Sequence, residues 1–290
     1  MAIKYDQNLL NLLIFKTSNI TAINNEFFYA IFFKIYKFIL IIKIKIINFI
    51  NKIILRFIKK KSNFYILNLN LSKKEDVKFT TNFFAEKNYC YYENFLNENS
   101  YKLLLNNWPA KYFFNYSLDL TKYYKFGFNL VQKNSDDFKI YNTNCFKNKA
   151  ILSFVKLLTD YNKFKSILEL AGHDGENYRI YSFQASIAHP NSYLVPHMDS
   201  IQKYKDGSNM INFIYFIDGN DNDIEHSGGT SIYKDNKFKY PLLIPKTLKN
   251  SLLIYNTLGD FYHGFKQMKK NCFRKAITFQ VSSRDYNFTN

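Results

Sequence analysis

The chain has 290 residues, which is enough for one sizeable domain plus an extension. Hydrophobic residues make up 47% of it and aromatic residues 19%, and these values exclude an intrinsically disordered chain. The net charge of +17 is compatible with a nucleic-acid or membrane partner. Because no zinc-finger or RNA-recognition signature is present, we expect no nucleic-acid partner. The cysteines Cys90, Cys145 and Cys272 form no CxxC pair, which excludes a disulfide framework and favours the cytoplasm.

The N-terminal segment, residues 1–62, is predicted to be a basic amphipathic helical extension. It holds eleven Lys and Arg residues against two acidic ones, a net charge of +9. Neither Gly nor Pro interrupts residues 27–61. Steps of three or four residues connect Lys45, Asn48, Lys52, Arg56 and Lys59, which predicts a long helix with a wide apolar face. Charges divide the segment too often for it to span a bilayer, which takes about 20 apolar residues. Two interpretations remain open: peripheral membrane contact, or packing against the rest of the protein or a partner.

Residues 63–88 are more polar and are predicted to be a connector, followed by a second unit over residues 89–290. That unit begins with a short strand near Tyr89 and a helix from about Asn99. A further helical stretch covers 147–170. After it come short β-type runs, namely YRIYSFQASIA, MINFIYFID, TSIYKD, SLLIYNT and RKAITFQVSS, separated by turn residues. This order predicts an α+β fold in which a sandwich or barrel of strands carries the functional site.

Three residues form a candidate metal site. His197 and Asp199 lie in YLVPHMDS, and side chains two residues apart on a strand point to the same face. The pair is weak by itself, because a chance H-x-D/E in a chain of this composition has a probability of roughly one third. His263 follows an apolar strand and a turn in LLIYNTLGDFYHGF. Two imidazoles and one carboxylate predict a non-haem Fe(II) site. Zinc is the competing metal, although no HExxH helix supports a zinc protease.

A candidate anion-binding residue follows in CFRKAITFQ. Strand alternation places Arg274 and Thr278 on one face and Lys275 on the other. A permanently charged guanidinium beside a hydroxyl suits the far carboxylate of a dicarboxylate ligand. The alternative is that Arg274 is an exposed charge on the strand.

These motifs together resemble a known family. From about Tyr89 to Arg284 the chain is similar to the 2-oxoglutarate and Fe(II)-dependent dioxygenase superfamily, nearest its prolyl-hydroxylase-like branch. YYENFLNENSYKLLL resembles the family's first strand and helix, YLVPHMDS its H-x-D strand, and MINFIYFID the strand that follows. HSGGTSIY resembles its G-G-x-T/L turn, and HGF with FRKAITF resembles the distal His followed by the Arg that binds 2-oxoglutarate.

The resemblance implies a fold and a chemistry. The fold is a double-stranded β-helix, or jelly roll, with flanking helices, here preceded by the long amphipathic helix. His197, Asp199 and His263 would bind Fe(II), and Arg274 with Thr278 would bind 2-oxoglutarate. Dioxygen is the remaining co-substrate. The implied reaction hydroxylates a substrate and releases succinate and carbon dioxide.

One family feature is missing at its expected place, and other functions stay open. In the family, a Tyr on the strand next to the H-x-D strand often donates a hydrogen bond to 2-oxoglutarate. Here the corresponding strand is MINFIYFID, in which Asn212 and Phe216 lie on one face and Tyr215 lies on the opposite face. Tyr181 or Tyr193 could supply the contact instead. The sequence does not identify the primary substrate, which is a small molecule or a peptidyl group. The alternatives are a catalytically degenerate, membrane-associated binding domain and a cupin-type isomerase or hydrolase.

Overall fold

The computed structural model describes most of the chain. The described residues are 26–59, 63–71, 74–117, 123–124, 127–133, 147–173, 178–199, 210–257 and 259–283. Cys145 therefore lies outside the described residues. The chain forms two compact units, Met1–Lys52 and Ile53–Asn290.

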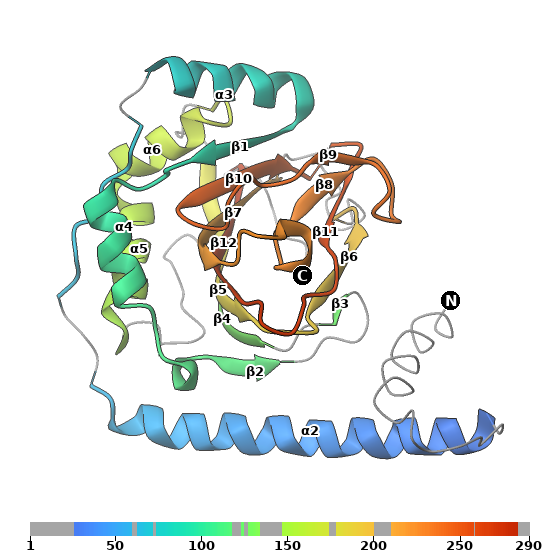
Figure 1. Cartoon of the computed structure of the whole chain (residues 1–290). Helices are drawn as coiled ribbons and strands as arrows, with labels where there is room; N and C mark the ends of the chain where they lie inside the picture. The colour runs from blue at the N-terminus through green and yellow to red at the C-terminus, as the bar shows by residue number, and fades with distance from the viewer. Residues whose placement is uncertain are drawn as a thin grey trace. The chain divides into compact units, whose positions relative to one another are not determined.

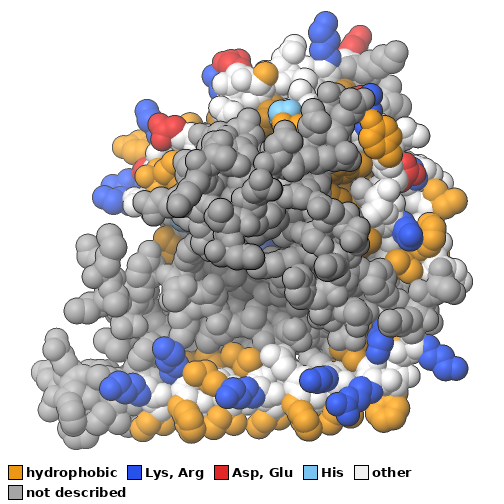
Figure 2. Space-filling view, turned by 180° about the vertical axis from the view of Figure 1, so that it is seen from behind, with side chains coloured by type: hydrophobic (Ala, Val, Ile, Leu, Met, Phe, Trp, Pro, Cys, Tyr) orange, Lys and Arg blue, Asp and Glu red, His pale blue; other side chains and the backbone are white. Residues whose placement is uncertain are grey.

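Helix α2, Glu26–Phe57, is 32 residues long. Along its length Figure 2 shows a row of basic side chains next to a row of hydrophobic ones. The exposed large hydrophobic residues of α2 are Ile35, Tyr36, Phe38, Ile39, Ile41, Ile42, Ile46, Phe49, Ile50, Ile53, Ile54 and Phe57. None of the helices that the structure describes is long and apolar enough to cross a membrane.

The segment predicted as a connector contains a helix. Helix α3, Lys74–Lys87, is followed by strand β1, Tyr89–Glu93. The chain turns between them at Asn88, whose φ of 62° is left-handed, a conformation that Asn tolerates better than most residues. Phe83 of α3 meets Tyr89 edge to face, with ring centroids 5.9 Å apart. Helix α3 therefore packs on the strand that follows it and belongs to the second unit.

The predicted helices from Asn99 and over 147–170 are both present. Helix α4, Glu98–Asn106, is capped by Asn97, whose side chain accepts a hydrogen bond from the Ser100 amide. The second stretch is two helices, α5 (Lys149–Thr159) and α6 (Tyr161–Glu169). It breaks at Asp160, because that side chain caps α6 by accepting a hydrogen bond from the Lys163 amide. A short 3-10 helix, η1, covers Lys111–Phe113.

The strands form two antiparallel sheets (Figure 1). The seven-stranded sheet has the order β1-β10-β7-β12-β5-β4-β2, and the five-stranded sheet has the order β3-β6-β11-β8-β9. The remaining strand bounds are β2 Asn115–Ser117, β3 Tyr123–Tyr124, β4 Gly127–Lys133, β5 Tyr178–Ala188, β6 Tyr193–His197, β7 Met210–Gly219, β8 Ser231–Tyr233, β9 Pro241–Leu243, β10 Ser251–Asn256, β11 Tyr262–Phe265 and β12 Arg274–Ser283. A second 3-10 helix, η4, covers Ile224–His226.

Strand β7 shows how the layers pack. Its Tyr215 faces helix α5, where Phe154 stacks on it with ring centroids 5.5 Å apart and planes at 13°. Its Ile214 and Phe216 point the other way, into a buried cluster that includes Ile232 of β8. Both faces of β7 are therefore covered, which explains its nearly continuous apolar sequence. Helices α4 and α5, the larger sheet and the smaller sheet form successive layers (Figure 1), which confirms the α+β prediction and supports the jelly roll.

Candidate metal centre

Two histidines face each other across the smaller sheet. His197 is the last residue of β6, and His263 on β11 is its direct cross-strand partner. Their ring centroids are 4.3 Å apart, with the planes at 52°. Since β6 and β11 are hydrogen-bonded neighbours, the pairing of these strands sets the spacing of the two imidazoles.

Gly264 allows this close pairing. A Cβ atom at this position would lie 2.5 Å from the Leu194 carbonyl oxygen and 2.9 Å from the Pro196 nitrogen, both on β6. The register between the strands also shifts between His263 and Phe265. A residue without a side chain is therefore required beside His263, because the backbone of β6 occupies the space that a side chain would need.

Asp199 completes the group. It lies two residues beyond the end of β6, which is shorter than the predicted strand. Its Oδ1 is 3.7 Å from Nε2 of His197 and 3.8 Å from Nε2 of His263. The ligand atoms of the three residues lie within 4.8 Å of one another, a spread that one metal ion can bridge. The structure thus brings together the three residues that the sequence analysis proposed as metal ligands.

The orientation of His197 favours metal binding. Its Nδ1 lies 2.9 Å from the backbone carbonyl oxygen of Val195. A carbonyl oxygen can only accept, so Nδ1 carries the proton, and in the neutral ring the lone pair is then on Nε2. Nε2 is the atom that faces Asp199. A backbone contact of this kind fixes both the tautomer and the ring orientation of a metal-binding histidine.

Two residues of the larger sheet reach this group. Asn212 of β7 donates a hydrogen bond from Nδ2 to Oδ2 of Asp199 at 2.8 Å. Tyr255 of β10 lies against His263, with ring centroids 4.6 Å apart and planes at 36°. Burial and then the charge of Asp199 raise the pKa of Tyr255 well above its usual value. The sequence showed which way Asn212 faces but gave no sign of its contact with Asp199.

Arg274 is buried without a carboxylate partner among the described residues. Its side chain is 6% exposed, which excludes the interpretation as an exposed strand charge. Nη1 donates to the Gly228 carbonyl oxygen at 2.7 Å and to Thr230 Oγ1 at 3.1 Å. Nε is buried and has no hydrogen-bond partner in the described part of the chain. Burial lowers the pKa of Arg274 to about 10, so the guanidinium is charged at neutral pH.

This cation lies beside the strand that carries His263. Its Cζ atom is 4.8 Å from the ring centre of Phe265, two residues after His263 on β11. A buried charge is costly unless an opposite charge compensates it. Among the described residues Nε has no hydrogen-bond partner and the guanidinium has no counter-charge, which fits a carboxylate ligand at this place, the role that the family resemblance implies for Arg274.

The other residues of the predicted co-substrate site have different surroundings. Lys275 pairs with Asp218 at 2.7 Å, so it is not part of the same site. Thr278 is half-buried, and Arg274 bonds to Thr230 rather than to it. Its role in binding 2-oxoglutarate therefore remains a prediction. Tyr215 faces helix α5, and the side chain of Tyr181 lies outside the described residues.

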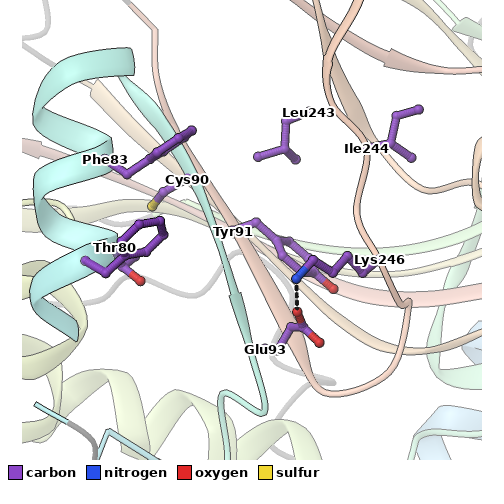
Figure 3. Close-up of a pocket in the computed structure, with 9 residues that line it drawn as sticks. Thr80, Phe83, Cys90, Tyr91, Glu93, Leu243, Ile244 and Lys246 are labelled. Carbon is purple, nitrogen blue, oxygen red and sulfur yellow. Dashed lines mark ion pairs between the residues drawn. The ribbon is translucent and has the colours of Figure 1, made fainter. Parts of the chain in front are cut away.

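A separate hollow of about 210 Å³ lies between α3, β1 and the loop that follows β9 (Figure 3). Apolar side chains, including Phe83 and Leu243, line it, and an ion pair of 2.9 Å joins Lys246 to Glu93 at its side. None of its lining residues belongs to the histidine–aspartate group. The hollow is therefore distinct from the candidate metal centre.

Comparison with solved structures identifies the fold. A prolyl hydroxylase of Trichoplax adhaerens, solved with a peptide of the hypoxia inducible factor oxygen degradation domain, aligns with a TM-score of 0.50 and 13% identity, covering 74% of this chain and 93% of that one. A Pseudomonas putida prolyl-4-hydroxylase aligns with a TM-score of 0.46 and 12% identity, covering 72% and 98%. A Burkholderia pseudomallei 2OG-Fe(II) oxygenase family protein aligns with a TM-score of 0.48 and 11% identity, covering 78% and 98%.

The sequence matches no protein-family model and no curated protein. At 13% identity, the likeness to the Trichoplax structure shows the fold alone. The chain has the fold of this prolyl hydroxylase, which agrees with the fold that the resemblance implied. Its ligands and its reaction depend on its own residues rather than on the fold.

Proposed function

We propose that the protein is a 2-oxoglutarate and Fe(II)-dependent dioxygenase that hydroxylates a small-molecule or peptidyl substrate. The observation that supports this proposal is that two features lie close together in the protein. A group of two imidazoles and one carboxylate, His197, Asp199 and His263, is the donor set typical of non-haem Fe(II) oxygenases. The buried Arg274, close to the same strand, lacks a counter-charge among the described residues.

Each residue has a defined part in this proposal. His197, His263 and Asp199 would hold Fe(II). Arg274 binds the distal carboxylate of 2-oxoglutarate, and Thr230 orients the guanidinium by accepting from Nη1. When bound, the iron and 2-oxoglutarate would supply, with dioxygen, the hydroxylation of a C–H bond, with release of succinate and carbon dioxide. The strands of the two sheets position these groups.

The two alternatives account for less of the site. A degenerate binding domain needs neither an intact ligand group nor a buried cation, and the protein has both. A cupin-type isomerase or hydrolase would use the metal group but has no need of a dicarboxylate anchor. Arg274 is thus the residue that favours a 2-oxoglutarate enzyme over a metal enzyme of another class.

The direct test is succinate release by the purified protein. We expect succinate to form when Fe(II), 2-oxoglutarate, dioxygen and a fractionated cell extract are all supplied, and not when Fe(II) is replaced by Zn(II). Fractionating the extract then identifies the substrate. Bound Fe(II) together with no affinity for 2-oxoglutarate would favour the cupin-type alternative, and a protein that binds neither would favour the degenerate domain.

For the N-terminal extension we propose peripheral attachment of a cytoplasmic protein to an anionic membrane. The supporting observation is that a row of exposed Ile, Phe and Tyr side chains on α2 lies beside a row of basic side chains (Figure 2). No Asp or Glu occurs between Lys34 and Phe57. A helix with these two rows can bury its apolar side chains at the level of the lipid headgroups while the lysines contact anionic lipid.

Vesicle co-sedimentation tests the attachment. We expect the full chain to bind vesicles containing phosphatidylserine, and to bind more weakly at high salt because screening reduces the attraction of surface charges. Replacing Phe38, Phe49 and Phe57 by Ser should abolish binding at both salt concentrations. As a control, pure phosphatidylcholine vesicles should bind poorly. Undiminished binding of the triple variant contradicts the proposal.

A further inference from the structure

The two oxygens of the Asp199 carboxylate have different surroundings. Oδ1 lies 3.7 Å and 3.8 Å from the Nε2 atoms of His197 and His263, the side on which a shared metal ion would bind. Oδ2 accepts a hydrogen bond of 2.8 Å from Nδ2 of Asn212. The Asp199 side chain is 27% exposed and follows the end of β6, so the strand itself does not hold it. The contact with Asn212 comes from the other sheet.

Asn212 occupies an interior position on a central strand. It is 1% exposed, and its direct cross-strand partners are Tyr255 on β10 and Gln280 on β12. It shares the face of β7 that carries Ile214 and Phe216 into the core between the sheets. A polar side chain here is unusual, because its neighbours on that face of the strand are apolar.

The amide group is oriented by its charged neighbour. With the reverse orientation, the Asn212 carbonyl oxygen would meet the Asp199 carboxylate and both would be acceptors, so the donor must face Asp199. Oδ1 of Asn212 is then buried without a hydrogen-bond partner among the described residues. A buried acceptor without a partner lowers the stability of the fold. Packing alone would therefore favour an apolar residue of similar size at this position.

We propose that Asn212 is a positioning residue for the metal centre. Its hydrogen bond to Oδ2 fixes the rotation of the Asp199 carboxylate, so that Oδ1 faces the two imidazole nitrogens before an ion arrives. Without this bond the partly exposed carboxylate can turn towards solvent, and the cost of ordering it then weakens metal binding. The inference rests on the proposed function in one respect, namely that His197, Asp199 and His263 bind a metal ion.

The test uses Co(II), whose visible absorption reports its coordination geometry, titrated into the metal-free full chain. For Asn212→Leu we expect 10- to 100-fold weaker Co(II) binding, the range typical for loss of such a contact, and a changed absorption spectrum. The denaturant midpoint of the metal-free variant should be unchanged or higher, because a buried acceptor without a partner has been removed. Gln280→Leu, on the neighbouring strand of the same sheet, should bind Co(II) as the unaltered protein does.

Three outcomes overturn the inference. If Asn212→Leu binds Co(II) with unaltered affinity and spectrum, Asn212 does not position Asp199. If its metal-free form loses stability in proportion to the lost affinity, Asn212 is only a structural residue. If the Asn212→Leu protein does not fold, both measurements are made on Asn212→Ala instead. If the unaltered protein binds no Co(II), the proposed function fails together with this inference.

Discussion

His197 and His263 are direct cross-strand partners, and Gly264 next to His263 leaves room for the two strands to approach. The geometry of the candidate metal centre is therefore set mainly by the backbone pairing of β6 and β11. Removing one imidazole would leave this pairing intact, so effects on metal binding can be separated from effects on folding.

Removal of a ligand should abolish metal binding. We expect His263→Ala, His197→Ala or Asp199→Ala to lose Fe(II) or Co(II) binding measured by titration, because only two donors remain. His226→Ala is the matched control, since that imidazole contacts Asp223 rather than the metal group. Full metal affinity in His263→Ala would show that the site is elsewhere.

Removal of the buried cation should weaken 2-oxoglutarate binding and spare the metal. For Arg274→Ala we expect a loss of about 1.5–3 kcal/mol, roughly ten- to hundredfold in Kd, because a charge-assisted hydrogen bond is lost. The measurement is calorimetric titration of 2-oxoglutarate into the Co(II) protein. Lys275→Ala, whose ammonium group pairs with Asp218, should have little effect. The opposite pattern would mean that Lys275 is the anchor.

Thr230 should matter less than Arg274 and in the same direction. Thr230→Val keeps the shape of the side chain but removes the acceptor for Arg274 Nη1. We expect a loss of 2-oxoglutarate affinity of about 0.5–1.5 kcal/mol with unchanged Co(II) binding, as for an ordinary hydrogen bond. Thr278→Val, titrated in parallel, tests the residue that the sequence analysis favoured. A larger effect at Thr278 would contradict the arrangement around Arg274.

A methyl group at Gly264 should separate the two histidines. The added Cβ would lie 2.5 Å from the Leu194 carbonyl oxygen, so β11 must move away from β6. For Gly264→Ala we expect a loss of about 1–3 kcal/mol in the free energy of unfolding, the usual cost of overpacking, together with weaker Co(II) binding. Denaturant unfolding and metal titration measure the two effects. Unchanged values for both would show that the strands have spare room.

Cys90 should resist thiol reagents in the folded protein. It is buried on β1, and burial raises the pKa of its thiol well above the usual range. Since the thiolate is the reactive form, we expect no modification of Cys90 by iodoacetamide between pH 7 and 9 in native buffer, and full modification in guanidinium. Peptide mass spectrometry follows the reaction. The partly exposed Cys272 serves as the internal comparison.

Much of the fold and the proximity of His197 to Asp199 could be predicted, because both depend on local patterns, whereas His263 was proposed from the motif order of the family that the chain resembles. Strand alternation correctly placed Phe216 and Asn212 on one face of β7 and Tyr215 on the other. Strand alternation likewise placed Arg274 and Lys275 on opposite faces of β12, and the two side chains have different partners. The spacing of His197 and Asp199 predicted that both would reach one point, although the strand ends at His197.

The remaining features depend on contacts between distant segments. Helix α3 was missed because its sequence is polar on average, and its stabilising contact with Tyr89 forms only after the chain turns at Asn88. Thr230 lies 44 residues from Arg274, and Asn212 lies 13 residues from Asp199 on another sheet. No periodicity encodes such pairs, because they are set by how the two sheets face each other.

The hydrogen bond from Asn212 to Asp199 joins the two sheets through the ligand group. An ion bound by Asp199, His197 and His263 would thus be connected to β7 of the larger sheet as well as to β6 and β11 of the smaller one. A metal ion that binds only the folded state raises the free energy of unfolding by RT ln(1 + [M]/Kd). This is about 2.7 kcal/mol when the free metal concentration is a hundred times Kd. Iron starvation would then shorten the lifetime of the protein against proteases, so its abundance would follow the supply of the metal.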